Sequence, residues 1–129
     1  MASILVCEPN HSTRSVLVNA LQDEGFEIFT AEDGRDASQQ ILAESPDFVL
    51  IEWLNFDIRN MNIEAFRRQM KRLRPETLFV FMSHKGPQKT VGEFATLVAD
   101  HGADAFVIKP FHPATVLEKI RSLQGQTTP

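Results

Sequence analysis

The stretch PDFVLIE (46–52) decides the fold, because its apolar core is continuous rather than alternating. A strand with one face in water alternates apolar and polar side chains, whereas a strand covered on both faces reads as an unbroken apolar run. The runs SILVC (3–7), LFVFM (78–82) and AFVIK (105–109) have similar length and bulk. FEIFTA (26–31) alternates more, as an exposed edge strand does. The sequence therefore predicts five strands in a sheet that is covered on both faces.

Helical stripes separate these strands. Apolar residues recur at the spacing of one helix face in four segments: Val16, Leu17, Ala20 and Leu21; Ile63, Phe66, Met70 and Leu73; Val91, Phe94, Ala95 and Val98; Val116, Leu117, Ile120 and Leu123. Ala37 and Ile41 form a weaker stripe. Gly25 and Gly102 stand where helices should end, and Pro113 where the last helix should begin. Strand and helix alternate five times, which predicts an α/β domain with a doubly wound parallel sheet.

Composition is that of an ordinary globular domain, with 129 residues, 43% hydrophobic and 23% charged. Thirteen basic against 17 acidic residues give a net charge of −4, which argues against a nucleic-acid binder acting through bulk charge. The single cysteine, Cys7, cannot form an internal disulfide, and no apolar run approaches the ~20 residues of a membrane span. We expect a cytoplasmic domain over residues 1–124, with 125–129 as a tail or the start of a linker.

Polar residues follow four of the predicted strands. Glu8 comes after the first strand, Glu52 after the third, Ser83 after the fourth and Lys109 after the fifth. Taken singly, Ser83 could cap a helix, and Glu8 and Lys109 could be solvated loop charges. Because open parallel sheets bind ligands outside the carboxyl ends of their strands, the four together predict a functional site at that edge.

The segments SILVCEPN (3–10), TAEDG (30–34), PDFVLIE (46–52), FMS (81–83) and HGADAFVIKPF (101–111) resemble the receiver domain of bacterial response regulators, from about residue 3 to 123. The resemblance implies a flavodoxin-like fold with strand order 2-1-3-4-5 and five helices. It also implies that Glu52 occupies the position of the aspartate that takes a phosphoryl group from a histidine kinase. An acidic pair that begins at Glu8 would help to hold Mg²⁺.

Further roles follow from the same resemblance. Ser83 and Lys109 would grip the phosphoryl oxygens, the Lys109–Pro110 bond would be cis, and Phe106 would be the aromatic that swings inward on activation. The family's partner face corresponds to residues 90–101, 104–108 and 113–123, which include Lys119 and Arg121. We expect a protein partner there, such as an output domain, a histidine kinase or a second copy in a homodimer. No membrane or direct nucleic-acid contact is expected.

Four departures set this sequence apart from the family pattern. Pro9 replaces the second acid of the pair and supplies neither a carboxylate nor a backbone N–H. Glu52 is one methylene longer than aspartate. The segment WLNFDIRNMN (53–62) is longer than the family's loop at this place. His84 stands where relatives commonly carry a small residue.

These departures predict an atypical receiver domain that lacks the acceptor aspartate and acts as a protein-interaction module rather than an enzyme. We expect no cofactor, and Mg²⁺ binding that is weak at best, through Glu8, Glu52 and Asp57 if at all. One alternative is a working phosphoacceptor that uses Glu52 or Asp57 with Mg²⁺. Another is a small flavodoxin-like ligand binder, although EPNHSTRS (8–15) contains no glycine with which to cradle a phosphate.

Overall fold

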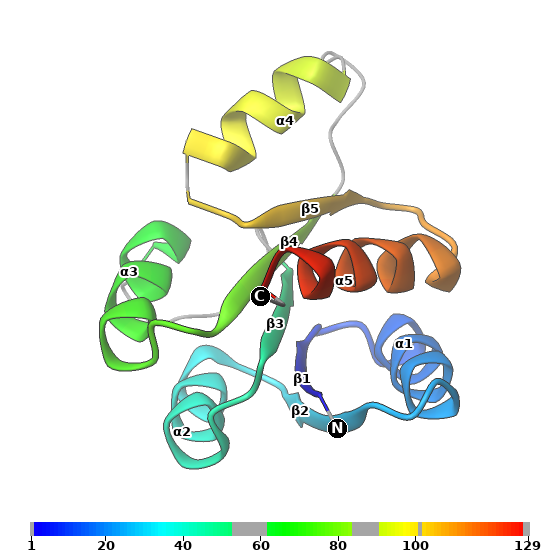
Figure 1. The fold of residues 1–129 in the computed structure, drawn as a ribbon, viewed down its shortest axis with the longest axis horizontal. Helices are drawn as coiled ribbons and strands as arrows, with labels where there is room; N and C mark the ends of the chain where they lie inside the picture. Colours follow the sequence, from blue (N-terminus) through cyan, green and yellow to red (C-terminus); the bar gives the residue numbers. More distant parts are fainter. Residues whose placement is uncertain (1, 53–61, 84–90, 101, 128–129) are drawn as a thin grey trace.

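A computed structural model of the chain describes residues 2–52, 62–83, 91–100 and 102–127. Strands and helices alternate as β1 (Ser3–Cys7), α1 (His11–Asp23), β2 (Glu27–Ala31), α2 (Gly34–Glu44), β3 (Phe48–Glu52), α3 (Ile63–Leu73), β4 (Leu78–Ser83), α4 (Val91–Asp100), β5 (Ala105–Ile108) and α5 (Pro113–Thr127). The strands pair in parallel in the order β2-β1-β3-β4-β5 (Figure 1). This order confirms the prediction, with β2 as an edge strand.

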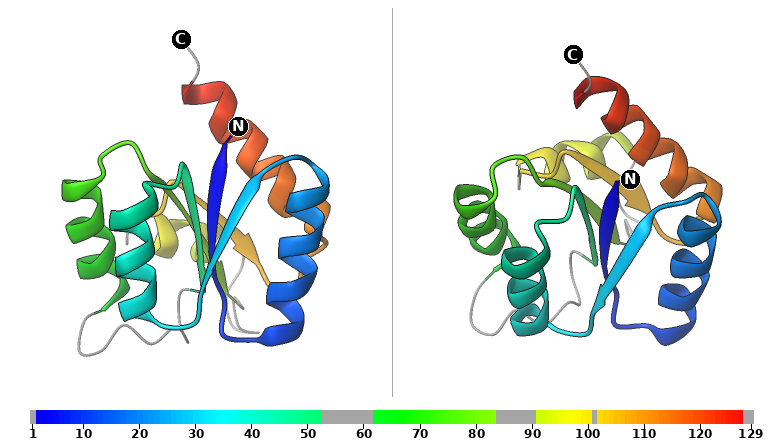
Figure 2. Two further views of the ribbon diagram at one scale, coloured as in Figure 1. Left: turned by 90° about the horizontal axis from the view of Figure 1, so that it is seen from below. Right: turned by 60° about the horizontal axis from the view of Figure 1, so that its bottom comes forward.

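Helices cover both faces of the sheet, with α2 and α3 on one side and α1 and α5 on the other (Figure 2). The buried side chains form two clusters, one on each face of the sheet. Leu5 and Phe66 belong to the cluster on the α2–α3 side, whereas Val6 and Ile120 belong to the cluster on the α1–α5 side. Because Leu5 and Val6 are neighbours on one strand and point to opposite faces, both must be apolar, which explains the continuous runs.

The helix ends use the residues that the sequence offers for them. The side chains of Asn10, Asp33 and Asn62 cap α1, α2 and α3, accepting hydrogen bonds from Thr13, Asp36 and Ala65 backbone N–H groups at 2.9, 2.8 and 2.8 Å. Gly25 and Gly102 lie just beyond α1 and α4 with φ of 92° and 85°, which favours glycine. Pro113 is the first residue of α5. The predicted stops at the two glycines and the predicted start at Pro113 are confirmed.

Two residues of the predicted stripes do not face the core. Val16 is 52% exposed, whereas its neighbour Leu17 is fully buried, since adjacent helical positions differ by about 100° in direction. Leu73, the last residue of α3, is 46% exposed. In the stripe on α4, the side chains of Val91, Phe94 and Val98 lie outside the described residues.

The longest described helix, α5, has 15 residues and continues past Leu123 to Thr127. Among the helices that the structure describes, none is long and apolar enough to cross a membrane.

Candidate functional site

Strand register brings the predicted site residues to one edge of the sheet. Cys7 on β1 is paired with Ile51 on β3, so the residues that follow them, Glu8 and Glu52, lie at the same level. Ser83 at the end of β4 is paired with Ile108 at the end of β5, and Lys109 comes next. The two carboxylates therefore lie on neighbouring strands, with the hydroxyl and the ammonium entering from the two strands beyond.

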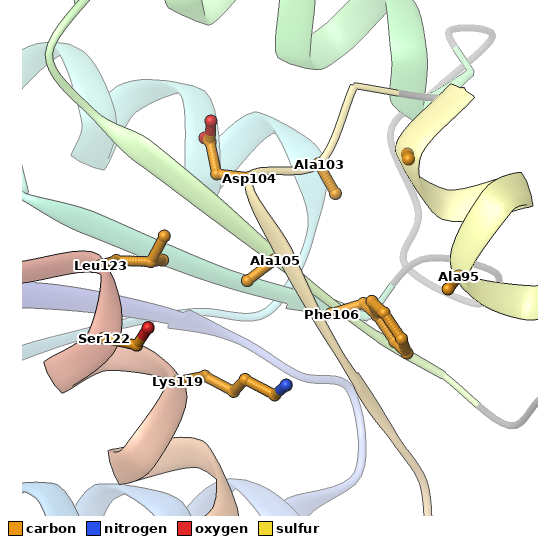
Figure 3. Close-up of a pocket in the computed structure, with 9 residues that line it drawn as sticks. Ala95, Ala103, Asp104, Ala105, Phe106, Lys119, Ser122 and Leu123 are labelled. Carbon is orange, nitrogen blue, oxygen red and sulfur yellow. The ribbon is translucent and has the colours of Figure 1, made fainter. Parts of the chain in front are cut away.

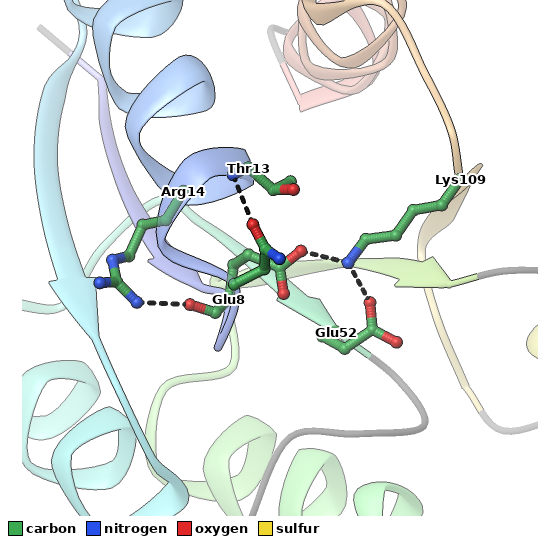
Figure 4. Close-up of polar contacts among 6 residues, drawn as sticks. Glu8, Thr13, Arg14, Glu52 and Lys109 are labelled. Atoms are coloured by element: carbon green, nitrogen blue, oxygen red, sulfur yellow. Dashed lines mark hydrogen bonds and ion pairs between the residues drawn. The ribbon is translucent and has the colours of Figure 1, made fainter.

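The side chain of Lys109 reaches across this edge and joins both carboxylates (Figure 4). Its Nζ donates to Glu8 Oε1 and lies 2.6 Å from Glu52 Oε2. Glu8, Glu52 and Ser83 are buried. We call Glu8, Glu52 and Lys109 the Lys109 cluster. The structure thus places the Lys109 ammonium between two glutamates.

Charge is unbalanced within the Lys109 cluster, since one ammonium faces two carboxylates. Glu8 Oε2 and Glu52 Oε1 are buried and have no hydrogen-bond partner in the described part of the chain. Burial acts to lower the pKa of Lys109, but the contacts with Glu52 and Glu8 outweigh it and raise that pKa above its ordinary value. Lys109 is therefore held as a cation, and the cluster keeps unused acceptor oxygens.

Arg14 on α1 supports the backbone of the cluster at Glu8, and no sequence pattern singled it out. Its Nη1 donates a 2.8 Å hydrogen bond to the backbone carbonyl oxygen of Glu8 (Figure 4). The helix that carries Arg14 begins directly after the turn that contains Pro9, so the side chain can reach back over one turn. Arg14 thereby fixes the backbone from which the Glu8 side chain extends.

The described residues fit a Mg²⁺ site poorly. Mg²⁺ requires near-octahedral oxygen ligands, and the cluster offers two carboxylates with an ammonium between them. The next residue after Glu8 is Pro9, which brings no carboxylate. No group of three or more His, Cys, Asp or Glu side chains able to hold a metal occurs within the described ranges. Asp57, His84 and the segment 53–61 lie outside those ranges.

Two features implied by the family resemblance lie along β5 and just after it. The Lys109–Pro110 peptide bond is cis, which confirms the expectation for this bond. Phe106 is partly buried and packs against the core cluster on the α2–α3 side. Lys119 Nζ from α5 lies 5.7 Å from the centroid of the Phe106 ring.

The opposite end of β5 is held by contacts from α3 that the sequence did not suggest. Lys71 Nζ lies 3.4 Å from Asp104 Oδ2, and the same oxygen accepts a 2.8 Å hydrogen bond from the backbone N–H of Phe79. Arg67 lies against Gly102 so closely that a Cβ added there would be 2.3 Å from Arg67 Nε. A glycine in the middle of HGAD (101–104) could have suggested a close approach, but not its partner.

Comparisons with known proteins agree with this architecture. Residues 4–121 match the family described as response regulator receiver domain. The chain is 23% identical over 127 residues to the phosphate regulon transcriptional regulatory protein PhoB of Pseudomonas aeruginosa, covering 98% of this chain and 53% of that protein. It is 29% identical over 124 residues to the aerobic respiration control protein ArcA of Escherichia coli, covering 96% and 49%. The chain thus spans about half the length of these curated relatives.

Solved structures give the same result. NtrX from Brucella abortus superimposes with a TM-score of 0.78 at 30% identity, over 97% of this chain and 27% of that one. A response regulator from Desulfuromonas acetoxidans gives a TM-score of 0.83 over 99% and 100% of the two chains, and at 15% identity it supports the fold alone. With the receiver match covering residues 4–121 on this fold, the chain belongs to the response regulator receiver domain family of two-component signalling.

Proposed function

We propose that the chain is an atypical receiver domain that acts as a protein-interaction module and is not switched by conventional aspartyl phosphorylation. The observation that carries this proposal is the Lys109 cluster. The ammonium of Lys109 lies between Glu8 and Glu52, where an ordinary receiver would need room for a phosphoryl group and its metal ion. The acceptor position holds Glu52, whose extra methylene moves the carboxylate toward Lys109.

Two departures act against phosphoryl transfer in this arrangement. A nucleophile misplaced by ~1 Å loses on the order of a hundredfold in rate, so Glu52 is a poor substitute for aspartate. Pro9 removes one of the carboxylates that would neutralise the incoming phosphate through Mg²⁺. The positive charge of Lys109 remains and would attract a phosphoryl group, but two glutamates already engage it.

Phosphorylation by a small phosphodonor tests the proposal directly. The wild-type protein is incubated with acetyl phosphate and Mg²⁺ and its intact mass is measured, and we expect no addition of a phosphoryl group. Glu52→Asp should resist as well, because Pro9 still withholds a metal ligand. The double variant Glu52→Asp/Pro9→Asp is the matched control, and labelling of the double variant alone would locate the defect at Pro9. Labelling of the wild-type chain contradicts the proposal.

Magnesium titration gives an independent test. Trp53, the only tryptophan, is adjacent to Glu52 in the sequence, so its fluorescence reports on the site. We expect little change below millimolar Mg²⁺ in the wild-type protein and a tighter response in Pro9→Asp. A saturable response of the wild-type protein at submillimolar Mg²⁺ would contradict this expectation.

A second candidate function is a working phosphoacceptor that uses Glu52 or Asp57 with Mg²⁺. The observation in its favour is the pair of buried carboxylate oxygens, Glu8 Oε2 and Glu52 Oε1, without hydrogen-bond partners in the described part of the chain. Such oxygens are costly unless a cation or donor meets them. The same labelling experiment separates the candidates, because wild-type labelling that disappears in Glu52→Gln or in Asp57→Asn would identify the acceptor.

We further propose that a protein partner docks on the face made by α4, β5 and α5. A pocket of about 400 Å³ lies there, and Figure 3 shows Phe106 on β5 and Lys119 on α5 at its wall. The rest of its lining is mostly small, contributed by Ala95, Ala99, Ala103, Asp104, Ala105, Ser122 and Leu123. Small side chains around one aromatic leave room for a partner's apolar side chain, which favours docking at this pocket.

The structure also sharpens the test of this face. Lys119 lines the pocket, but Arg121, expected on the same face, forms a 3.0 Å ion pair with Glu24 beside α1. Lys119→Glu and Ala99→Arg should therefore weaken output-domain binding or dimerisation, whereas Arg121→Glu should not. The assignment of the face fails if the two pocket variants leave every identified interaction intact.

A further inference from the structure

Charge is strongly segregated along this chain. Residues 63–74 contain five basic residues, Arg67, Arg68, Lys71, Arg72 and Arg74, against one acidic residue, Glu64, which is a net charge of +4. Since the whole chain carries −4, the remaining residues carry −8. A positive helix on an otherwise negative molecule produces a local field that attracts and orients an acidic partner.

Arg74 organises the carboxyl ends of α2 and α3. Its Nη2 donates to the carbonyl oxygen of Leu42, its Nη1 to that of Leu73 at 2.8 Å, and its Nε to Ser45 Oγ at 2.8 Å. Because one guanidinium binds both carbonyl oxygens, the backbones of the two leucines lie close together where α2 and α3 run side by side (Figures 1 and 2). Arg74 therefore has a structural role, joining the ends of the two helices, and each of its three guanidinium nitrogens already donates a hydrogen bond.

Leu42 and Leu73 are both exposed, at 38% and 46%. Among the described residues, the only other large apolar side chain with comparable exposure is Val16 on α1. Single exposed leucines are common on protein surfaces, but two exposed leucines on adjoining helix ends, with arginines on the same helices, have the composition of an interface centre.

Two arginines on the outer face of α3 flank this leucine pair. Arg68 and Arg72 are one helical turn apart, and Arg72 precedes Leu73. Arg68 forms only an exposed pair with Glu64 at 2.8 Å, which a stronger acceptor can displace at little cost. Arg72 is exposed and has no ion-pair partner in the described part of the chain. We call Leu42, Arg68, Arg72 and Leu73 the α2–α3 surface.

We propose that the α2–α3 surface docks an acidic protein segment, which places carboxylates on Arg68 and Arg72 and an aliphatic side chain on the leucine pair. The inference goes beyond the proposed function, because the surface is separate from both the Lys109 cluster and the α4–β5–α5 face. A short acidic segment fits better than nucleic acid, since a long polyanion would also meet the remaining charge of −8.

The test uses a fluorescein-labelled helical peptide built from Glu, Leu and Ala, with fluorescence polarisation as the readout. We expect saturable binding that weakens about tenfold or more in Arg68→Glu/Arg72→Glu, since each ion pair is not merely lost but becomes repulsive. Leu73→Ala should weaken binding about threefold through lost apolar contact. The double variant Arg35→Glu/Arg121→Glu changes the net charge equally at two exposed arginines outside the α2–α3 surface and should leave affinity within about twofold, once overall charge is screened by salt.

Three results would overturn the proposal. These are equal loss of binding in the Arg35→Glu/Arg121→Glu control, equal binding of a peptide with its leucines changed to alanine, or binding of duplex DNA as tight as that of the peptide. Self-association of the wild-type chain in sedimentation, abolished in Arg68→Glu/Arg72→Glu, would assign the surface to a second copy instead. Circular dichroism checks the fold of each variant, and Arg68→Gln/Arg72→Gln provides a milder pair that should show a smaller loss in the same direction.

Discussion

The two ends of β5 are each held by a lysine and carboxylate contacts, but they are built differently. At the amino end, the side chain of Asp104 receives a backbone hydrogen bond from Phe79 and the charge of Lys71, and both charged side chains remain partly exposed. At the carboxyl end, Lys109 meets two buried glutamates, and two of their oxygens have neither a hydrogen-bond nor an ion-pair partner within the described ranges. The partly exposed ion pair at the amino end has one cation for one carboxylate and stabilises the fold. The buried carboxylates at the carboxyl end outnumber their cation, which is typical of a functional site.

Replacing the lysine at each end of β5 should give the largest difference in the free energy of unfolding. Lys109→Met leaves two buried carboxylates without a cation, and we expect a loss of about 3–5 kcal/mol in the free energy of unfolding. Lys71→Met breaks a partly exposed pair and should cost less than about 1 kcal/mol, because solvent screens what remains. Urea unfolding followed by circular dichroism measures both. Similar losses for the two variants would show that the ends of β5 are not distinguished by burial.

Gly102→Ala should have the second largest effect on the free energy of unfolding, since it strains the backbone just before the amino end of β5. Gly102 and Gly25 both have positive φ, so an added Cβ strains each by about 1 kcal/mol. At Gly25 the new methyl meets nothing within 4 Å, whereas at Gly102 it collides with the Arg67 guanidinium. We expect Gly25→Ala to cost about 1 kcal/mol and Gly102→Ala somewhat more, up to about 2 kcal/mol, because the flexible end of Arg67 can move aside only by leaving its place against residue 102; thermal unfolding measures both. Arg67→Ala should remove the difference in cost between Gly102→Ala and Gly25→Ala. If the difference persists in that background, the collision with Arg67 does not cause it.

The sequence predicted the fold well because the information was local. Continuous apolar runs gave the strands, and Gly25, Gly102 and Pro113 marked helix ends. Val16 and Leu73 were predicted to face the core and are exposed instead. A small rotation of the helix about its axis decides whether side chains at such positions face the core or the solvent. Strand order came from the family resemblance rather than from the runs, since parallel pairing joins residues far apart in the sequence.

The candidate site was predictable in its members but not in its contacts. Placing Glu8, Glu52, Ser83 and Lys109 at the strand ends required only the rule for parallel sheets. That Lys109 would bridge both glutamates depends on register and on side-chain reach, which no local pattern encodes. Arg14 and Arg67 were missed for a related reason, because basic residues on helices usually face water, and only the fold brings these two to a carbonyl and a glycine.

Alkaline titration should separate buried Cys7 from partly buried Lys109, with a smaller effect on stability. Burial, aided by the charge of Asp36, raises the pKa of the Cys7 thiol well above its ordinary value of 9.0, so the unfolded chain loses this proton first and stability falls above that pH. The loss should reach about 1 kcal/mol by pH 10 and be absent in Cys7→Ala. Lys109 also has a raised pKa, so its contribution to stability stays complete up to its ordinary pKa of 10.5 and declines only above that pH. The chain has no tyrosine to obscure this order, which unfolding free energies at successive pH values would measure.

Glu52→Gln should have the smallest effect on stability, although it changes the acceptor position itself. Two carboxylates share one ammonium, so removing one of them leaves Lys109 matched with Glu8, and we expect a change within about 1 kcal/mol. A loss as large as that of Lys109→Met would mean that Glu8 does not share the charge.

The same variant bears on why a glutamate occupies this position. If the Glu52 carboxylate stands in for a phosphoryl group, its removal frees Lys109 from that side, and Phe106 should turn from its partly buried place toward solvent. Crystal structures of the wild-type protein and of Glu52→Gln would measure the exposure of Phe106 in each, with Glu8→Gln as the matched control, since it removes an equal charge from the neighbouring strand. Movement of Phe106 in Glu52→Gln alone would show that the Glu52 carboxylate holds Phe106 inward, as a permanent substitute for a phosphoryl group. Identical positions in all three would reduce Glu52 to an ion-pair partner that only keeps Lys109 in place.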